Sequence, residues 1–470
     1  MKKRIFSVCL VLVLLAGLLA GCGKQDDVQT PGNDGADGTG TETITLNWVS
    51  DGGWAQNEKA DKILEKWYAV HPEIQINRIE VGSQVDDAYL ANLDTMIGGG
   101  ETVDLTYLTY DEVYKRVLAG GALPLDEYIQ AAGDDYESMY GTLSTSLLQY
   151  RDEIYGVPYA GNTFKVFYNK TVTDAAGITI PESWSIEEFT EVARQLNDPE
   201  NGFYGCIFPS NWDQICYVSA QLSGWCSVER LDDGTVVPNF DDETFKTCLK
   251  WVHDLAAVDK VTPDYGTIKA ESINRRQALA EGKTAMIIDG PFTLVWLQNY
   301  MFNDPGAGEL GFELGVTDIP YVNDAGREVS YNTVAGAFYV PKTAAHPAEA
   351  YEFAKFICNE CPEEAANYMP IYSGADMAAA TKSFTEYTDN NGVLHTEVYP
   401  EEVALAAVAT PYEAYVARWN FDPTLSAYTS LMEKTLFTEQ YGLYLNGEME
   451  LDEWVDMMQQ LGQAEIANMN

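Results

Sequence analysis

The sequence predicts an α/β fold made of two series of alternating strands and helices. Strand-like and helix-like segments alternate between residues 43 and 108, and a second alternation begins near residue 184. The short apolar run Thr284–Ile288 has Gly close to both ends, which suits a strand buried on both faces of a sheet. Alternation of this kind is typical of a parallel sheet covered by helices, and the chain beyond residue 42 is long enough for two such domains.

The first 21 residues have the pattern of a cleavable signal peptide. Basic residues at positions 2 to 4 precede the apolar stretch Ile5–Leu19, and Leu19-Ala20-Gly21-Cys22 has the small residues of a cleavage site. The stretch is too short for a membrane-spanning helix. Because a cysteine follows the cleavage site, the segment resembles a bacterial lipoprotein signal, and the resemblance implies a lipid on Cys22. The alternative is an ordinary secretory signal followed by an incidental cysteine.

Residues 22–42 are predicted to form a flexible tether behind the lipidated cysteine. The segment Gly23–Glu42 has almost no apolar residue, so it cannot bury enough surface to offset the entropy of ordering. No later apolar run approaches membrane-spanning length. We therefore expect a globular body at the outer face of the cell membrane, held there by the lipid.

The chain is strongly acidic. It has 28 basic and 72 acidic residues and a formal net charge of −44, which becomes −47 when the three basic residues of the signal peptide are lost. Such a surface repels polyanions, which argues against nucleic acid and strongly anionic solutes as partners. Solubility at a cell surface is the plainer explanation, and we attribute most of the acidity to it.

Hydrophobic periodicity gives the first series of elements. Residues 43–49 alternate with Ile44, Leu46 and Trp48 on one face, and the next segment has apolar residues at helical spacing. The predicted order is strand Thr43–Val49, helix Asn57–His71, strand Ile74–Ile79, helix Asp86–Ile97 and strand Val103–Leu108.

The second series contains the element with the clearest boundaries. The helix Ser272–Glu281 should end at Gly282, because Gly enters the left-handed conformation without steric cost. The buried strand Thr284–Ile288 should follow, and Asp289-Gly290-Pro291 should then turn the chain. The other predicted elements are helices at Trp184–Leu196, Asp213–Gly224, Pro347–Asn359 and beyond Asp422, and strands at Gly202–Phe208, Phe312–Ile319 and Val334–Val340.

Four segments carry a resemblance to a known family. Glu281–Met286, followed by Gly290-Pro291-Phe292, closely resembles the segment by which the family 1 extracellular solute-binding proteins, the maltose-binding protein type, are known. Ala122–Asp126, Ile154–Tyr159 and Val166–Lys170 match further segments of that family. The resemblance spans essentially the whole body, with departures mainly in loops.

The resemblance implies a periplasmic-binding-protein-like fold, in which two α/β lobes are joined by a hinge and enclose a central ligand cleft. We expect the N-terminal lobe to contain residues 43–161 and 312–343, and the C-terminal lobe residues 162–311 and 344–470. The chain would cross between the lobes near Asn162–Lys165, Phe312–Asp318 and Pro341–Thr343.

Aromatic and polar residues on the predicted loops are the candidate ligand contacts. Sugars have apolar C–H faces that pack against rings, and hydroxyls that need planar donors and acceptors. In the family, the aromatic after Gly-Pro stacks on a sugar ring; here it is Phe292, whereas Trp is commoner. Each ring taken alone could equally be a core residue. By the resemblance, the ligand contacts are Asp51, Trp54, Tyr110, Asp111, Asn162, Asn211, Trp212, Phe292 and Trp419.

Catalytic and metal-binding motifs are weak. The sequence has no His-Glu-x-x-His, phosphate loop, Gly-x-Ser-x-Gly or calcium loop, so we expect no catalytic residue, metal or cofactor. The body cysteines are too sparse for a disulfide scaffold, although bridges among them remain an alternative. The segment Cys358-Asn-Glu-Cys361 could be a redox or zinc motif, but it has no second ligand pair and no nearby His, which favours buried or incidental thiols. The body cysteines are Cys206, Cys216, Cys226, Cys248, Cys358 and Cys361.

The residues and the resemblance together predict a binding protein. We expect an extracellular lipoprotein that captures a neutral carbohydrate, above all an oligosaccharide, and delivers it as a monomer to the permease subunits of an ABC transporter. A secreted carbohydrate-active enzyme that uses two of the many carboxylates is the first alternative. A binding protein for a polyol, polyamine or glycerophosphodiester is the second.

Overall fold

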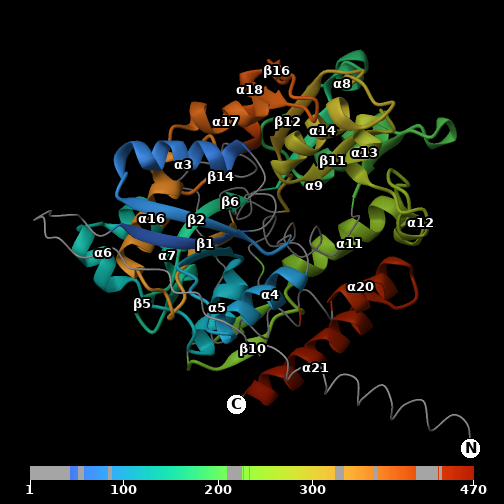
Figure 1. Ribbon diagram of the computed structural model, residues 1–470. Coiled ribbons are helices and arrows are strands. Elements are labelled where there is room, and N and C mark those ends of the chain that lie inside the picture. The colour runs from blue at the N-terminus through green and yellow to red at the C-terminus, as the bar shows by residue number, and fades with distance from the viewer. Residues whose placement is uncertain are drawn as a thin grey trace, which may run out of the picture. The chain divides into compact units, whose positions relative to one another are not determined.

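The computed structural model describes most of the body of the chain (Figure 1). The signal peptide, Cys22, the tether and the predicted helix Asp213–Gly224 lie outside the described residues. The described residues are 43–50, 58–82, 87–162, 164–208, 225, 227–231, 233–322, 333–364, 369–408, 432 and 437–469.

The first large sheet has the strand order β14-β6-β13-β3-β1-β2. Strand β1 (Ile44–Ser50) pairs in parallel with β2 (Ile74–Glu80) and β3 (Leu105–Leu108), as the alternation of strands and helices predicts. The other three strands run antiparallel to their neighbours. They are β6 (Val157–Asn162), β13 (Thr333–Tyr339) and β14 (Met369–Pro370).

Different helices cover the two faces of this sheet. Alternation along β1 places Trp48 in one core and Val49 in another. The core of Trp48 is completed by α3 and α16, and the Phe353 ring of α16 lies edge-on to Trp48 with centroids 5.5 Å apart. The core of Val49 is completed by α4 and α5. The bounds of these helices are α3 Glu58–Val70, α4 Asp87–Gly98, α5 Tyr110–Leu118 and α16 Pro347–Glu360.

The second large sheet has the strand order β12-β7-β11-β8. Strand β11 is buried along its whole length, as predicted for the run Thr284–Ile288, and it pairs in parallel with β8. Strand β7 runs antiparallel to both β11 and β12. The strand bounds are β7 Lys165–Asn169, β8 Tyr204–Ile207, β11 Thr284–Asp289 and β12 Leu314–Asp318.

Alternate residues of β11 belong to two different cores. Met286 and Ile288 pack in the core that contains α9 and α11, whereas Ile287 packs in the core that contains α13 and α14. Strand alternation therefore puts Asp289 on the face of Ile287, towards α13 and α14. The bounds of these helices are α9 Ile186–Leu196, α11 Glu243–Ala257, α13 Arg275–Ala280 and α14 Phe292–Asn303.

Local signals fix the ends of the helices next to this sheet. Ser185 and Glu188 form a capping box, in which each side chain accepts a hydrogen bond from the backbone N–H of the other, and this starts α9. At the start of α13, the Asn274 side chain accepts from the Arg276 backbone N–H. After α13, Gly282 has a φ of +65°, the left-handed conformation that the sequence predicts there.

The two sheets group three segments differently from the expected lobes. The strand expected at Phe312–Ile319 in the N-terminal lobe is β12, which pairs with β7 in the second sheet. Helix α16, expected in the C-terminal lobe, packs on the first sheet, and β14 joins that sheet. A crossing was expected near Pro341–Thr343, but the chain stays with the first sheet until β14. The next helix, α17 (Met377–Thr385), carries Phe384, which packs with α13 and α14. Hydrophobic periodicity tells which residues face inward, but it does not choose between two sheets.

The other described elements are short strands paired in twos and helices around the large sheets. No helix within the described ranges is long and apolar enough to cross a membrane. These elements are α6 Asp126–Ala132, α7 Tyr136–Leu147, β4 Gln149–Tyr150, β5 Glu153–Ile154, α8 Lys170–Ala175, η1 Pro199–Asn201, β9 Val228–Arg230, β10 Val236–Pro238, α12 Tyr265–Ala270, α17 Met377–Thr385, β15 Glu386–Thr388, β16 Leu394–Thr396, α18 Glu401–Val408, α20 Phe437–Leu445 and α21 Leu451–Met469.

Candidate functional site

Strand β11 leads directly into the Gly-Pro-aromatic motif. The strand ends at Asp289, Gly290 and Pro291 follow, and Phe292 is the first residue of α14. The three residues before Phe292 are buried, and Phe292 itself is half-buried. In open α/β sheets, ligands bind beyond the carboxyl ends of the strands. Phe292 thus lies at the end of the second sheet where a ligand is expected.

Asp289 is a fully buried carboxylate held by two arginines. Arg275 donates from Nε and Nη2 to Asp289 Oδ2 and Oδ1, both at 2.9 Å. Arg276 donates to the same oxygens from its own Nε and Nη2 at 2.7 and 3.2 Å, and the Gly290 N–H donates to Oδ1 at 2.8 Å. Burial alone would raise the pKa of the Asp289 carboxyl, but the two guanidinium charges and their hydrogen bonds hold that pKa below its usual value.

The Arg276 guanidinium also packs on the Phe292 ring. Its Cζ atom lies 4.7 Å from the ring centroid, which is within the range of a cation–π contact. The contact joins α13, which carries both arginines, to the first residue of α14. The orientation of the Phe292 ring is thereby tied to a buried ion pair.

Charged residues form a row across the second sheet at this end. Lys165 of β7 is in register with Asp289 on one side and with Asp318 of β12 on the other. The buried Lys165 Nζ forms an ion pair with the Asp318 carboxylate. Together with Arg275 and Arg276, the row contains three cations and two carboxylates, so its net charge is +1, whereas the whole chain carries −44.

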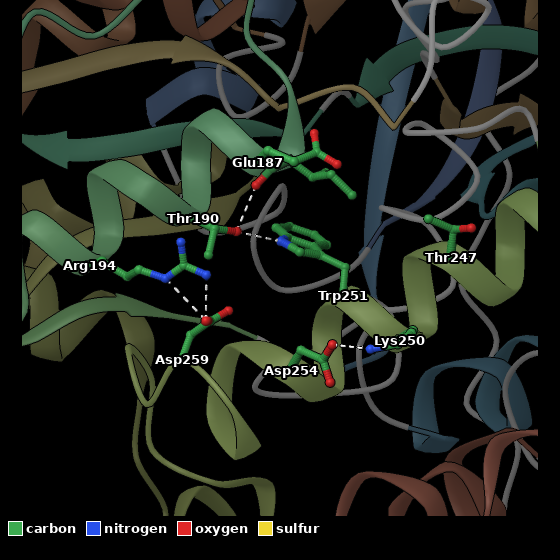
Figure 2. A pocket seen from close by; sticks show the side chains of 9 residues that line it. Glu187, Thr190, Arg194, Thr247, Lys250, Trp251, Asp254 and Asp259 are labelled. Atoms are coloured by element: carbon green, nitrogen blue, oxygen red, sulfur yellow. Dashed lines mark hydrogen bonds and ion pairs between the residues drawn. The ribbon is translucent and has the colours of Figure 1, made fainter.

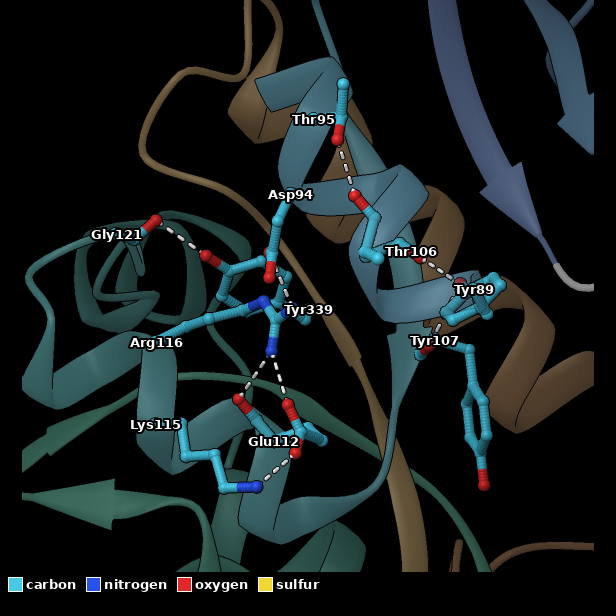
Figure 3. Close-up of polar contacts among 11 residues, drawn as sticks. Tyr89, Asp94, Thr95, Thr106, Tyr107, Glu112, Lys115, Arg116, Gly121 and Tyr339 are labelled. Carbon is cyan, nitrogen blue, oxygen red and sulfur yellow. Dashed lines mark hydrogen bonds and ion pairs between the residues drawn. The ribbon is translucent and has the colours of Figure 1, made fainter. Parts of the chain in front are cut away.

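Aromatic side chains gather near the end of β3 in the first sheet. Tyr107 lies edge-on to Tyr159 of β6 and to Phe338 of β13, with ring centroids 5.2 and 5.9 Å away. Figure 3 shows the Tyr107 ring directed away from the polar contacts of Arg116. The half-buried Tyr110 follows as the first residue of α5.

A polar network holds the helices beside β3 (Figure 3). Arg116 of α5 donates from Nη2 to Asp94 Oδ1 of α4 at 2.7 Å and from Nη1 to Glu112 Oε2 at 2.8 Å. The hydroxyls of Tyr89 on α4 and Thr106 on β3 are 2.6 Å apart. These contacts connect α5 to α4 and α4 to β3.

The predicted contacts divide between described and undescribed parts of the chain. Tyr110, Asp111 and Asn162 follow or end strands of the first sheet, and Phe292 follows a strand of the second. Only the backbone is described for Asp111, the second residue of α5, and for Asn162, the last residue of β6. The predicted contacts Asp51, Trp54, Asn211, Trp212 and Trp419 lie outside the described residues.

The residues that the sequence-based prediction missed are the charged ones of the second sheet. Arg275, Arg276 and Asp289 were each within the family motif or just before it, but none was a candidate. The available signal was an aspartate at the end of an otherwise apolar buried strand, because a buried carboxylate needs a cationic partner. The paired arginines near the start of the preceding helix supply it.

A separate surface pocket of about 270 Å³ lies between α9 and α11 (Figure 2). Four of its charged side chains form two ion pairs: Arg194 with Asp259, and Lys250 with Asp254. The Trp251 Nε1 atom donates to Thr190 Oγ1 at 2.9 Å. None of the predicted contact residues lines it. The lining residues are Ile186, Glu187, Thr190, Arg194, Thr247, Lys250, Trp251, Asp254 and Asp259.

The described cysteines are buried free thiols. Cys206, Cys248, Cys358 and Cys361 form no disulfide, and burial raises the pKa of Cys206, Cys358 and Cys361 thiols. The prediction of buried thiols at Cys358 and Cys361 is confirmed. Within the described ranges, no three His, Cys, Asp or Glu side chains come together in a way that could hold a metal ion.

Comparisons with known proteins agree on one family. The model of the family described as bacterial extracellular solute-binding protein matches residues 42–360. A maltotriose-binding protein of Pyrococcus abyssi is 25% identical over 267 residues, which is 57% of this chain and 51% of that protein. The chain thus spans about half the length of that relative.

Two further proteins match over most of their length. A galactooligosaccharide-binding protein of Bacillus subtilis is 24% identical over 436 residues, 87% of this chain and 92% of that protein. The solved structure of an ABC substrate-binding protein from Listeria monocytogenes in complex with cycloalternan superposes with a TM-score of 0.63 at 18% identity, covering 90% of this chain and 99% of that one. The structural match confirms the predicted periplasmic-binding-protein-like α/β fold.

Proposed function

Because the chain belongs to the family of bacterial extracellular solute-binding proteins, we propose that it captures a neutral oligosaccharide outside the cell and delivers it to the permease subunits of an ABC transporter. The relatives named for maltotriose and for galactooligosaccharide support the choice of an oligosaccharide. The observation that carries the proposal is Phe292, a half-buried ring held by Arg276 at the carboxyl end of β11.

The ring suits a sugar for a physical reason. The C–H groups on the face of a pyranose pack well on an aromatic ring, and such contacts require a ring of fixed orientation. The Arg276 contact supplies that fixed orientation. In this proposal Tyr110, Asp111 and Asn162 contact the sugar from the first sheet, and Asp51, Trp54, Asn211, Trp212 and Trp419 complete the site.

Delivery depends on closure of two lobes around the solute. We assign the first sheet, with the chain up to β6 and again from β13 to β14, to one lobe, and the second sheet to the other. A solute that contacts both lobes binds the closed form better and so shifts the balance towards it. A transporter can then distinguish loaded from empty protein.

The N-terminus would place the protein where this delivery occurs. We propose that Cys22 carries the lipid and that residues 23–42 hold a monomeric body near the permease. Changing Cys22 to Ala should move the protein from the detergent phase to the aqueous phase in a partitioning assay, and unchanged partitioning would contradict the anchor.

A binding experiment tests the proposed function. The purified mature chain should bind at least one of maltotriose, a galactooligosaccharide and cycloalternan in isothermal titration calorimetry, and should release no cleavage products. Phe292→Ala should weaken that binding by about 1–3 kcal/mol, since large aromatic rings dominate binding energy. The matched control is Phe302→Ala, which removes the same ring from the far end of the same helix, where it stacks on His395.

Two outcomes would overturn the proposal. One is binding of a polyol, polyamine or glycerophosphodiester with no binding of the oligosaccharides. The other is hydrolysis of an oligosaccharide by the purified protein, which would indicate a carbohydrate-active enzyme.

A further inference from the structure

We infer that Trp296 and Tyr300 of α14 form an outer subsite, a surface on which the outer units of a longer oligosaccharide bind. The inference rests on the proposed function, because the inner units of the same sugar occupy the site at Phe292. It deepens that function by giving the site a preference for chain length. It also assigns a binding role to two rings that lie beyond the Gly-Pro-aromatic motif.

Helix α14 has one side in the core and one side outside it. Its buried residues are Thr293, Leu294, Leu297 and Gln298. With 3.6 residues per turn, Trp296 and Tyr300 lie on the opposite side of the helix, and both are half-buried. Positions 292, 296 and 300 are four residues apart, so they follow one another along the same side of α14.

The rings of Trp296 and Tyr300 stack on each other. Their centroids are 5.6 Å apart and their planes differ by 14°. Trp296 also packs against the core that contains α13 and α14. Tyr300, in contrast, packs against none of the hydrophobic cores formed by the described residues. Trp296 therefore supports Tyr300 from the side of the core, and Tyr300 is the outer ring of the pair.

The polar atoms of the two rings are open to water. Among the residues that the structure describes, neither Trp296 Nε1 nor Tyr300 Oη has a hydrogen-bond partner, and neither atom is buried. Other indole N–H groups donate to protein oxygens, namely those of Trp67, Trp184, Trp225, Trp251 and Trp454. Trp296 thus differs from these core tryptophans, because its indole edge reaches the surface.

The outer side of α14 carries no charge. None of the 12 residues of the helix is Asp, Glu, Lys or Arg, although the whole chain has a net charge of −44. The exposed Asn299 lies next to Tyr300, and its amide oxygen accepts from Asn303 Nδ2 at 2.9 Å. Its amide nitrogen has no partner within the described ranges, so an uncharged donor lies beside the two rings.

These features define the ligand as a neutral sugar of sufficient length. The C–H face of a pyranose packs on an aromatic ring, and its hydroxyls bind uncharged polar groups. Each helical residue rises 1.5 Å, so Tyr300 lies about 12 Å along the helix axis from Phe292. A short sugar held at Phe292 does not reach Tyr300, whereas a longer chain does. The outer subsite therefore favours longer oligosaccharides over shorter ones.

A length series measured by calorimetry tests the inference. The probes are the linear maltooligosaccharides from maltose to maltohexaose, and the galactooligosaccharides of the same lengths. For the parent, Kd should fall as the probe lengthens. Tyr300→Ala should weaken binding of the longest probe about 3- to 10-fold, the range for one aromatic contact, and should leave the shortest bound probe unchanged. Tyr300→Phe keeps the ring and should bind every probe as the parent does.

Two further variants separate binding from structure. Trp296→Ala removes the ring that supports Tyr300, so it should cause the same length-dependent loss; thermal unfolding checks that it is folded, and Tyr300→Ala carries the test if it is not. Phe302→Ala is the matched control, because this ring of α14 stacks on His395 and not on the pair. It should leave the length series unchanged. A general structural effect would weaken the binding of short and long probes alike.

The outcomes are distinguishable. If the parent binds short and long probes equally tightly, or if Tyr300→Ala changes the binding of all lengths by the same factor, the inference is overturned while the proposed function stands. If the parent binds no probe of either series, the proposed function fails and the inference fails with it.

Discussion

Asp289 is the residue on which the end of the second sheet depends. Its side chain is fully buried, and a buried carboxylate is tolerated only when cations and hydrogen bonds compensate the loss of water. Arg275 and Arg276 provide this compensation, and the Gly290 N–H adds a bond from the turn itself. The ion cluster thus stabilises the turn that leads to Phe292.

Replacement of Asp289 by Asn should be strongly destabilising. The amide has the shape of the carboxylate but no charge, so it leaves two guanidinium groups without their counter-ion. We expect the free energy of unfolding at pH 7 to fall by about 3–5 kcal/mol, measured by urea denaturation. Asp174→Asn, which breaks the exposed pair with Lys170, is the control and should leave the free energy of unfolding nearly unchanged. Equal losses for the two variants would contradict the role of the buried cluster.

Asp289 should also make the free energy of unfolding depend on pH in the acidic range. The pKa of Asp289 is lowered in the folded chain, so its contribution is fully present above the unfolded pKa of about 3.9 and is lost as the pH falls through the lower folded value. The difference in unfolding free energy between the parent and Asp289→Asn should therefore shrink as the pH falls below about 4. A difference that stays constant down to the acid limit of the folded state would contradict this linkage.

Single residues were predictable from the sequence where a local motif identifies them. Phe292 follows Gly-Pro directly, and the structure places it at the carboxyl end of β11, as predicted. Its partner Arg276 lies 16 positions earlier on a different helix, so their contact depends on how α13 and α14 pack on β11. The sequence shows no periodicity that would reveal such a contact.

At the scale of elements, the packing of α9 on β8 depends on a glycine. A Cβ atom on Gly205 would lie 2.1 Å from the Ala193 carbonyl oxygen of α9, far below any tolerable contact. The backbone of the helix therefore approaches the strand more closely than any side chain would allow. This approach brings Phe189 of α9 into the core beneath β11.

Gly205→Ala should force α9 away from the sheet. We expect the free energy of unfolding, measured by chemical denaturation, to fall by about 1–3 kcal/mol. Other substitutions that add atoms to a well-packed core have losses of this size. Gly308→Ala is the control, because a Cβ there meets nothing within 4 Å, and it should change stability by less than about 0.5 kcal/mol. A tolerated Gly205→Ala would mean that α9 can shift without loss of packing.

The ends of an element could be predicted from the sequence where local residues define them. The sheet that an element joins could not, because it depends on partners far away in the sequence. The capping box at Ser185 and the stop at Gly282 are local, and the corresponding helix ends fall within a few residues of their predicted positions. Strand β12 has a pattern that fits either sheet, and its pairing with β7 depends on residues about 150 positions away. Helix α16 was likewise expected in the C-terminal lobe, and no local signal shows that it packs on the first sheet.

At the scale of the whole molecule, two neighbouring crossings connect the sheets. Strand β6 is followed by β7, and β12 is followed by β13. The strands β6 and β13 are paired in the first sheet, and β7 and β12 are paired in the second. The two crossings therefore run in opposite directions and join two adjacent strands of the first sheet to two adjacent strands of the second. The ion pair between Lys165 and Asp318 links β7 and β12 at the end of the second sheet where one crossing arrives and the other leaves.

Paired crossings of this kind are suited to a hinge. Rotation about them requires changes in only a few backbone dihedral angles, while the hydrogen bonds within each sheet stay intact.

If the sheets rotate towards each other around a bound sugar, saturating ligand should reduce the radius of gyration of the Cys22→Ala chain in solution scattering. At the same ligand concentration, Phe292→Ala should keep a larger radius than the parent, because its weaker binding leaves more of the open form. Phe302→Ala should contract as the parent does. An unchanged radius with an oligosaccharide that calorimetry shows to be tightly bound would exclude the hinge, and the bound sugar would then have to be recognised by the transporter without a change in the shape of its carrier.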